Sequence, residues 1–169
     1  MEDIVFHPIG IIHSEYKHTK DTPIQPASGM GTSGSVEILP EYVDGLQDIG
    51  GFSHLILIYH FNRSPGYKLK VKPFLDKNLH GVFSTRTPFR PNPIGLSVVK
   101  LNSRNKNILE IENIDILDGT PLFDIKPFIP DFDAVENVKI GRVTKSRDKI
   151  SNTLNDGRFE SESKIINQK

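Results

Sequence analysis

Cysteine is absent from the 169-residue chain. This absence excludes a disulfide-stapled scaffold, a zinc site built from thiolates and a cysteine nucleophile. Long hydrophobic runs are missing too: no stretch approaches the roughly 18 apolar residues that a membrane span needs, and the N-terminal MEDIVFHPIG is acidic, unlike a signal peptide. We therefore expect a cytoplasmic protein with no membrane partner, whose length suffices to bury a hydrophobic core without disulfides or metals.

Several motifs that would announce a function are also missing. The chain has no calcium loop, no two-histidine zinc spacing, no P-loop and no G-x-G-x-x-G fingerprint. Ser84 and Ser97 lack the G-x-S-x-G context of a hydrolase nucleophile. The sequence therefore predicts no metal site and gives little support to a hydrolase.

The net charge of zero hides an asymmetric distribution. Residues 61–106 contain ten Lys or Arg and one acid, whereas residues 107–136 contain eight acids and one Lys. Two interpretations are open: the two segments pair with each other across the fold, or a basic surface for phosphates lies beside an acidic patch for a cationic ligand.

Short β-branched runs bounded by Gly, Pro and Ser dominate the first 137 residues, and such runs are typical of strands. We expect strands at 6–14, 34–38, 54–61, 98–101, 108–116 and 122–125, a short helix at 40–49, and a patternless loop at 17–34. His54 and His60 should share one face of their strand. Because alternating helices are missing, the fold class is all-β or β-dominated, with short helices and a barrel or sandwich closure. From residue 138 the composition becomes polar, which separates a core domain (1–137) from a C-terminal polar extension (138–169) that contains one possible strand, VKIGRV.

The segment GVFSTRTPFRPNPIGLS (81–97) is the most distinctive in the chain. Pro88, Pro91 and Pro93 fix several φ angles, so Arg86 and Arg90 are presented by a stiff backbone. Planar guanidinium groups suit a carboxylate or a phosphate. The alternative is a proline-rich connection with solvated arginines; we favour a binding loop.

A second polar cluster is NIDILDGTPLFDIK (113–126). Asp115 and Asp118 flank two apolar residues, and Asp118-Gly119-Thr120-Pro121 predicts a turn. The carboxylates suit ribose hydroxyls or a cationic ligand, and equally Asp118 suits an Asx bond that caps its own turn.

Taken in order, PIGIIHS, GFSHLILIYHF, GVFSTRTPFRPNPIGLS and DILDGTPLFDIKPFIP resemble the signature blocks of the TsaA-like, or TrmO, family. The resemblance covers residues 6 to 133. It implies a single-sheet β-barrel, a homodimer with its cofactor site near the interface, and an S-adenosylmethionine-dependent tRNA (adenine-N6)-methyltransferase. Members act on threonylcarbamoyladenosine next to the anticodon. Many bacterial members carry a C-terminal domain larger than the polar extension of this chain.

The resemblance also implies the cofactor-binding positions. The family motif Pro-x-Gln-Pro-Gly matches residues 23–27, with Ala27 in place of the usual Gly. Asn62 and Arg63 stand where the family often has His and a polar residue. The implied cofactor contacts are Gln25, Pro26, Ala27, Asn62, Arg63, Arg86, Leu96, Asp115, Ile116, Leu117 and Asp118. No catalytic residue is assigned.

The residue chemistry agrees with this cofactor, which carries a carboxylate, an amine, a sulfonium and a ribose. We expect Arg86 to pair with the carboxylate, Asp115 or Asp118 to contact the ribose or amino group, and the basic segment to meet tRNA phosphates. Two alternatives are a non-catalytic nucleotide- or RNA-binding module and a methyltransferase that acts on a small metabolite.

Overall fold

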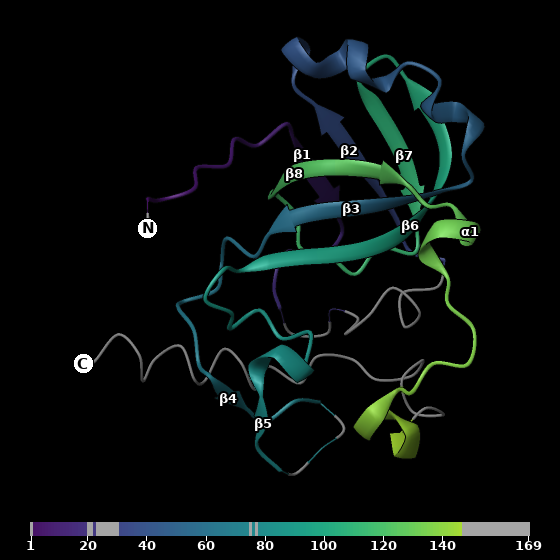
Figure 1. Cartoon of the computed structure of the whole chain (residues 1–169). Coiled ribbons are helices and arrows are strands. Elements are labelled where there is room, and N and C mark those ends of the chain that lie inside the picture. The colour runs from purple at the N-terminus through teal and green to yellow at the C-terminus, as the bar shows by residue number, and fades with distance from the viewer. Residues whose placement is uncertain (1, 20–21, 23–30, 75, 77, 147–169) are drawn as a thin grey trace.

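A computed structural model describes residues 2–19, 22, 31–74, 76 and 78–146 (Figure 1). Its main feature is one sheet of six antiparallel strands that closes into a barrel in the order β1-β2-β7-β6-β3-β8. The strands are β1 (Gly10–Ser14), β2 (Ser33–Ile38), β3 (His54–His60), β6 (Ile94–Asn105), β7 (Ile108–Glu112) and β8 (Thr120–Pro127). The structure thus confirms the β-dominated class and the single-sheet barrel, which leaves none of the six strands as an open edge.

The hydrophobic core fills the barrel because side chains alternate along each strand. In β3, Leu55, Leu57 and Tyr59 are buried and point inward, while the residues between them are only half-buried. His54 and His60 both belong to this outer set, which confirms the prediction that they share a face. The core is completed by aliphatic side chains from the other strands and from the segment after β7, among them Ile12, Val36, Val99, Leu109, Ile111, Ile114 and Leu122.

Tyr59 is the one bulky aromatic ring directed into the core cluster from the described strands, and a glycine makes room for it. Gly95 lies opposite Tyr59 in the β3–β6 pairing. A Cβ at Gly95 would lie 2.2 Å from the Tyr59 ring, so only glycine fits there without displacing the ring. The Pro-Ile-Gly motif is therefore, in part, a packing device at one end of the barrel.

Strand pairing places the ends of the six strands in two groups. Ser14 pairs with Gly34, Gly34 with Ile111, and His60 with Ile94, so these residues lie at the same end of the barrel. The segment between β7 and β8 returns at this end, since Thr120 pairs with Ile12. We call it the site end. The far end carries the 3₁₀ helices η2 (Pro40–Leu46) and η3 (Ile49–Gly51), the β6–β7 hairpin and α1 (Pro130–Asp133).

A small unit is inserted between β3 and β6, and Figure 1 places it below the barrel. It contains the two-stranded sheet of β4 (Lys70–Val71) and β5 (His80–Gly81), followed by the 3₁₀ turn η4 (Val82–Ser84). Val71 and Phe89 are buried against each other, with Phe74 packed on them. This second small core holds the insertion in a defined shape beside the site end.

Several element boundaries differ from the prediction. The first strand begins at Gly10 instead of residue 6, because Phe6 lies outside the barrel, where it packs on Phe123 at 5.4 Å. The strand expected at 98–101 is longer: β6 extends over residues 94–105. Its first half pairs with β3 and its second half with β7, so it is paired along its whole length. The expected helix at 40–49 is two short 3₁₀ helices, and VKIGRV forms no strand: η5 (Gly141–Ser146) overlaps it.

Candidate functional site

The site end of the barrel gathers most of the residues that the sequence singled out. Asn62 and Arg63 follow β3, Arg86 precedes β6, and Asp115 to Asp118 connect β7 to β8. These positions are up to 56 residues apart in the chain, and barrel closure brings them to the same end. Gln25, Pro26 and Ala27 lie outside the described residues.

The flanking residue Gly31 shows where that early segment rejoins the barrel. Its N–H donates to the Asn113 side-chain oxygen at 3.0 Å, and the Thr32 hydroxyl donates to the Ile114 carbonyl at 3.0 Å. The chain therefore enters β2 directly beside the residues that lead to Asp115.

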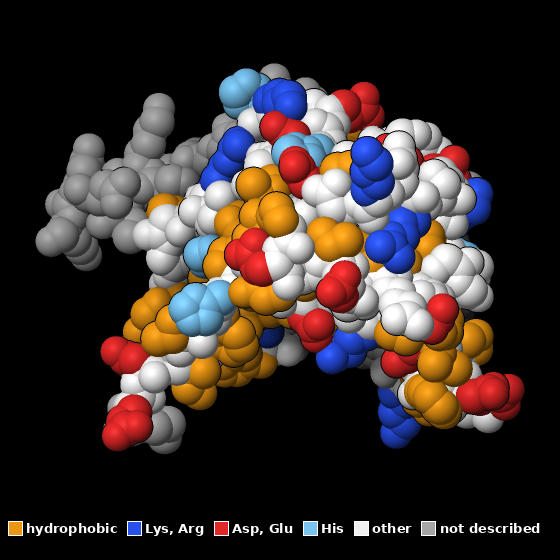
Figure 2. Space-filling view, turned by 90° about the horizontal axis from the view of Figure 1, so that it is seen from above, with side chains coloured by type: hydrophobic (Ala, Val, Ile, Leu, Met, Phe, Trp, Pro, Cys, Tyr) orange, Lys and Arg blue, Asp and Glu red, His pale blue; other side chains and the backbone are white. Residues whose placement is uncertain are grey.

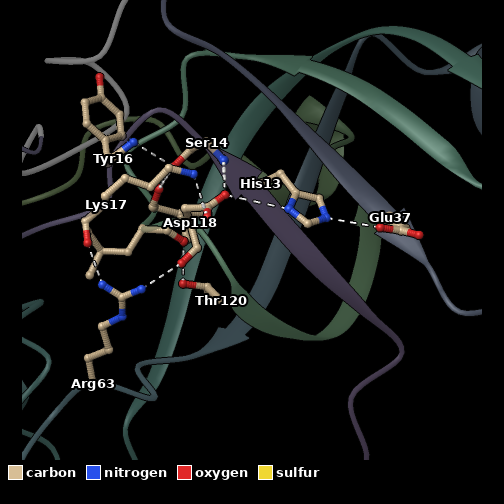
Figure 3. Close-up of polar contacts among 10 residues, drawn as sticks. His13, Ser14, Tyr16, Lys17, Glu37, Arg63, Asp118 and Thr120 are labelled. Atoms are coloured by element: carbon tan, nitrogen blue, oxygen red, sulfur yellow. Dashed lines mark hydrogen bonds and ion pairs between the residues drawn. The ribbon is translucent and has the colours of Figure 1, made fainter.

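Asp118 is held by a network that joins three segments (Figure 3). Its carboxylate accepts a hydrogen bond from the Ser14 N–H at 3.2 Å and forms an ion pair with the Lys17 ammonium at 2.7 Å. His13 Nδ1 lies 3.7 Å away, while its Nε2 contacts Glu37 at 3.2 Å. The Lys17 hydrogen bond holds the pKa of Asp118 below its usual range. Asp118 thus fixes the end of β1 against the β7–β8 connection.

Arg63 reinforces the same junction. Its guanidinium donates to the Lys17 carbonyl at 2.6 Å and to the Asp118 carbonyl at 3.1 Å (Figure 3). The Thr120 hydroxyl donates to the Leu117 carbonyl at 2.7 Å, and Gly119 takes the positive φ of +74° that the turn prediction requires. Arg63 therefore joins the segment after β1 to the β7–β8 connection by hydrogen bonds to the backbone of each.

Asp115 has different surroundings. Its carboxylate accepts a 2.7 Å hydrogen bond from the Ser97 hydroxyl, and Ser97 in turn contacts the Tyr59 hydroxyl at 3.1 Å. Since Ser97 has one hydroxyl hydrogen and gives it to Asp115, Tyr59 is the donor to Ser97. A chain of two hydrogen bonds thus runs from the barrel interior to Asp115. Burial raises the pKa of Asp115 to about 6.

Arg86 is exposed at the same end of the barrel. Its positive charge opposes the effect of burial on the pKa values of both Asp115 and Tyr59, so it lies within electrostatic range of the two. A cationic guanidinium and a half-buried carboxylate therefore lie within electrostatic range of each other. This pairing suits a ligand that carries both a carboxylate and a positive charge.

Arg90 has a structural role instead. Its guanidinium donates to the carbonyl oxygens of Thr85 at 2.8 Å and Val82 at 3.2 Å, which ties it to its own loop. Of the two arginines that the sequence analysis placed in the 81–97 loop as ligand-binding residues, only Arg86 keeps that role. Arg90 stabilises the turn that precedes it.

The remaining predicted positions face different ways. Ile116 is buried in the core, and its carbonyl accepts from the Ser14 hydroxyl at 2.7 Å. Leu117 is half-buried in the same connection. Leu96 is exposed on the outer face of β6, because its neighbours Gly95 and Ser97 point inward.

Sequence reasoning missed Tyr59 and Ser97 as members of the site. The signal was available: each belongs to the inward-facing set of its strand, where a polar group needs a partner. Their partnership itself was not predictable, since Tyr59 and Ser97 are 38 residues apart and meet only through the β3–β6 pairing.

The basic and acidic segments pair only sparsely. Among the described residues one ion pair joins them, between Lys100 and Glu112 at 2.8 Å. Seen from above, acidic and basic side chains are interspersed, and hydrophobic side chains gather mainly toward the lower left of the view (Figure 2). In the part of the chain that the structure describes, no group of His, Asp and Glu could hold a metal, and no helix is long and apolar enough to cross a membrane.

Comparisons with known proteins place these features in a wider group. The family model of the tRNA-methyltransferase O N-terminal domain matches residues 11–134. A probable S-adenosyl-L-methionine-binding protein of Pyrococcus abyssi is 54% identical over 156 residues, which cover 92% of this chain and 85% of the relative. The tRNA (adenine(37)-N6)-methyltransferase of Escherichia coli is 36% identical over 140 residues, with 77% of this chain and 60% of the relative covered.

A crystal structure of TrmO from Pseudomonas aeruginosa superimposes with a TM-score of 0.71 at 34% identity. The match covers 83% of this chain and 63% of that one. The chain therefore spans about three fifths of the length of the bacterial proteins, and the shared part is the barrel with its site end.

Proposed function

The chain belongs to the tRNA-methyltransferase O family, and from this premise we propose that it is an S-adenosylmethionine-dependent tRNA (adenine-N6)-methyltransferase. The observation that carries the proposal is that barrel closure brings Arg86 and the half-buried carboxylate of Asp115 within electrostatic range of each other. S-adenosylmethionine, when bound, supplies an electrophilic methyl group on its sulfonium.

The substrate that we propose is threonylcarbamoyladenosine next to the anticodon of tRNA. Methylation replaces the hydrogen on N6, so the products are the methylated base, S-adenosylhomocysteine and one proton. Because the base stands in a single-stranded loop, exposing it costs less than extracting it from a duplex.

We assign the cofactor's carboxylate to Arg86, whose planar fork suits it. Its ribose or amino group we assign to Asp115 in preference to Asp118. Asp118 already accepts from Ser14 and pairs with Lys17, whereas Asp115 keeps carboxylate capacity beyond its bond from Ser97. The Tyr59–Ser97 chain orients Asp115, and Arg63 positions the connection that carries both aspartates. Methyl transfer needs alignment more than acid or base groups, so this rigid frame is the protein's main contribution.

We further propose a cytoplasmic homodimer with the site near the interface. The outer face of β6 supports this, because Ile94 and Leu96 are exposed side by side at its start, next to the site end. Leu96 then belongs to the interface that completes the site. A basic surface on the 61–106 segment would contact tRNA phosphates and make binding salt-dependent.

The deciding experiment is mass spectrometry of tRNA nucleosides after incubation with S-adenosylmethionine carrying a labelled methyl group. We expect one labelled methyl on threonylcarbamoyladenosine. Absence of label from every tRNA nucleoside would refute the activity, and label on unmodified adenosine would keep the activity but refute the substrate. Arg86→Ala is the matched variant, and near-normal cofactor affinity by calorimetry would remove Arg86 from the site.

A further inference from the structure

Phe83 is unusually exposed for a phenylalanine, with 74% of its surface accessible. It stands in η4, in the insertion between β3 and β6. Its neighbour Val82 is 1% exposed, so the turn directs one side chain into the insertion and the other out to solvent. Single exposed apolar residues are common, so exposure alone does not indicate a binding role. The contacts that hold the turn and the ring in place do indicate one.

The turn that carries Phe83 is held by hydrogen bonds from both side chains and backbone. The Ser84 hydroxyl donates to the Gly81 carbonyl at 2.7 Å, and the Thr85 hydroxyl donates to the Val82 carbonyl at 2.8 Å. The Val82 N–H donates to the Leu69 carbonyl at 2.9 Å. Arg90 adds its two bonds to the same turn. An exposed ring on so rigid a backbone loses little backbone entropy when a ligand packs on it.

Arg90 also supports the ring itself. Its guanidinium carbon lies 5.8 Å from the centroid of Phe83, within the range of a cation–π contact. Because the side chain stays 74% exposed, this contact leaves most of the ring accessible. A ring supported by an arginine and otherwise open is suited to stacking on a planar, electron-rich partner.

The charge around Phe83 specifies which planar partner fits. Lys70 pairs with Gly81 across the β4–β5 sheet, Lys72 follows in the same strand region, and Arg86 stands three residues beyond Phe83. Cations beside an exposed aromatic ring match a single-stranded nucleic acid, whose phosphates and bases alternate. Arg86 lies within electrostatic range of Asp115, so the turn stands near the site end.

We propose that Phe83 is a stacking platform for an unpaired nucleobase of the tRNA loop, next to the base that is methylated. The proposal rests on the proposed function for the identity of the RNA, and adds a residue that positions it. Arg90 is the positioning residue that holds the platform.

The chain contains no tryptophan, so Phe83→Trp creates a single fluorescent reporter at the platform. Phe132→Trp is the matched control, since Phe132 is 77% exposed and lies in α1 at the far end of the barrel. The probe is an anticodon stem-loop RNA that carries threonylcarbamoyladenosine next to the anticodon. We expect it to quench Phe83→Trp and to leave Phe132→Trp unchanged. An RNA duplex of equal length, whose bases are already stacked, should quench much less. An unquenched Phe83→Trp at saturating stem-loop would overturn the platform.

Substitution of the ring gives a second test. Phe83→Ala should weaken stem-loop binding roughly 5- to 100-fold, Phe83→Tyr should retain it, and both should bind S-adenosylmethionine as the wild type does. Unchanged RNA affinity of Phe83→Ala would also refute the proposal. The fluorescence needs no methyl transfer: quenching without transfer refutes the proposed activity alone, and transfer without quenching refutes the platform alone.

Discussion

Asp115 and Asp118 show how residues of one type, three positions apart, acquire opposite properties. Asp118 has the Lys17 ammonium at 2.7 Å, which lowers its pKa, while burial raises the pKa of Asp115 to about 6. The environment of Asp115 thus disfavours its anionic form. Charged groups in such environments lower the stability of the folded protein and are common at binding sites.

Asp115→Asn tests this at the residue scale. Burial raises the folded-state pKa of Asp115 to about 6, so the contribution of this group to stability is greatest below about pH 4, falls as the pH rises toward 6, and is constant at higher pH. Asn keeps an acceptor for Ser97 without the charge. We expect urea unfolding to show the variant more stable at pH 7 by about 1–3 kcal/mol, with the difference vanishing near pH 4.

The cofactor affinity should move the opposite way. In the wild type, calorimetry should show weaker S-adenosylmethionine binding as pH falls below about 6 and Asp115 gains a proton; in Asp115→Asn it should be weak and flat over this range. As a control, Asp118→Asn should be less stable than the wild type at pH 7, because a lowered pKa contributes stability at high pH. Equal pH profiles for wild type and Asp115→Asn would contradict the assignment.

At the scale of elements, the insertion between β3 and β6 holds the η4 turn, and with it Arg86, in a fixed position. Its small core of Val71 and Phe89 fixes the strands, Arg90 fixes the turn, and the turn presents Arg86 to the barrel end. The two arginines of this loop therefore have separate roles: Arg90 keeps the loop ordered, and Arg86 contacts the ligand in the proposed function.

Arg90→Met removes both carbonyl hydrogen bonds while keeping the aliphatic stem. Each such bond to a charged donor is worth about 1.5–3 kcal/mol, so we expect faster amide hydrogen exchange at residues 82–86 and a moderate loss of cofactor affinity. Arg86→Ala should lose more affinity with exchange in the turn unchanged. Identical exchange in wild type and Arg90→Met would show that the loop does not depend on Arg90.

For the whole molecule, the barrel has an inner face that holds it together and an outer face that remains partly apolar. Ile94 and Leu96 lie on that outer face at the start of β6, next to the site end. A homodimer through this surface would join the two sites and cover side chains that solvent otherwise contacts.

Leu96→Asp should dissociate the proposed dimer, because a buried unpaired carboxylate costs several kcal/mol. Sedimentation velocity should show a monomer at concentrations where the wild type is dimeric, together with weaker cofactor binding. Tyr42→Asp is the control: Tyr42 is 41% exposed, similar to Leu96 at 49%, but lies in η2 at the far end. A dimer that survives Leu96→Asp would place the interface elsewhere.

The sequence by itself determined the fold class, the inward and outward faces of the strands and the family. Alternation in residues 54–60, the Asp118–Pro121 turn and the four signature blocks are local patterns, and local sterics and hydrophobicity suffice to specify them. Strand limits were less predictable, since β6 owes its length to neighbours that are distant in sequence.

Only the tertiary structure decided the roles of individual side chains at the site end. Asp118 meets Ser14 across 104 residues, and Asp115 meets Ser97 across 18, so neither partner is visible in the motif that contains the aspartates. Arg90 turned out to serve its own loop, and the long apolar strand contributed Tyr59 to a polar chain. The physical reason is that barrel closure chooses the partners, and a partner sets the pKa and the remaining capacity of each charged group.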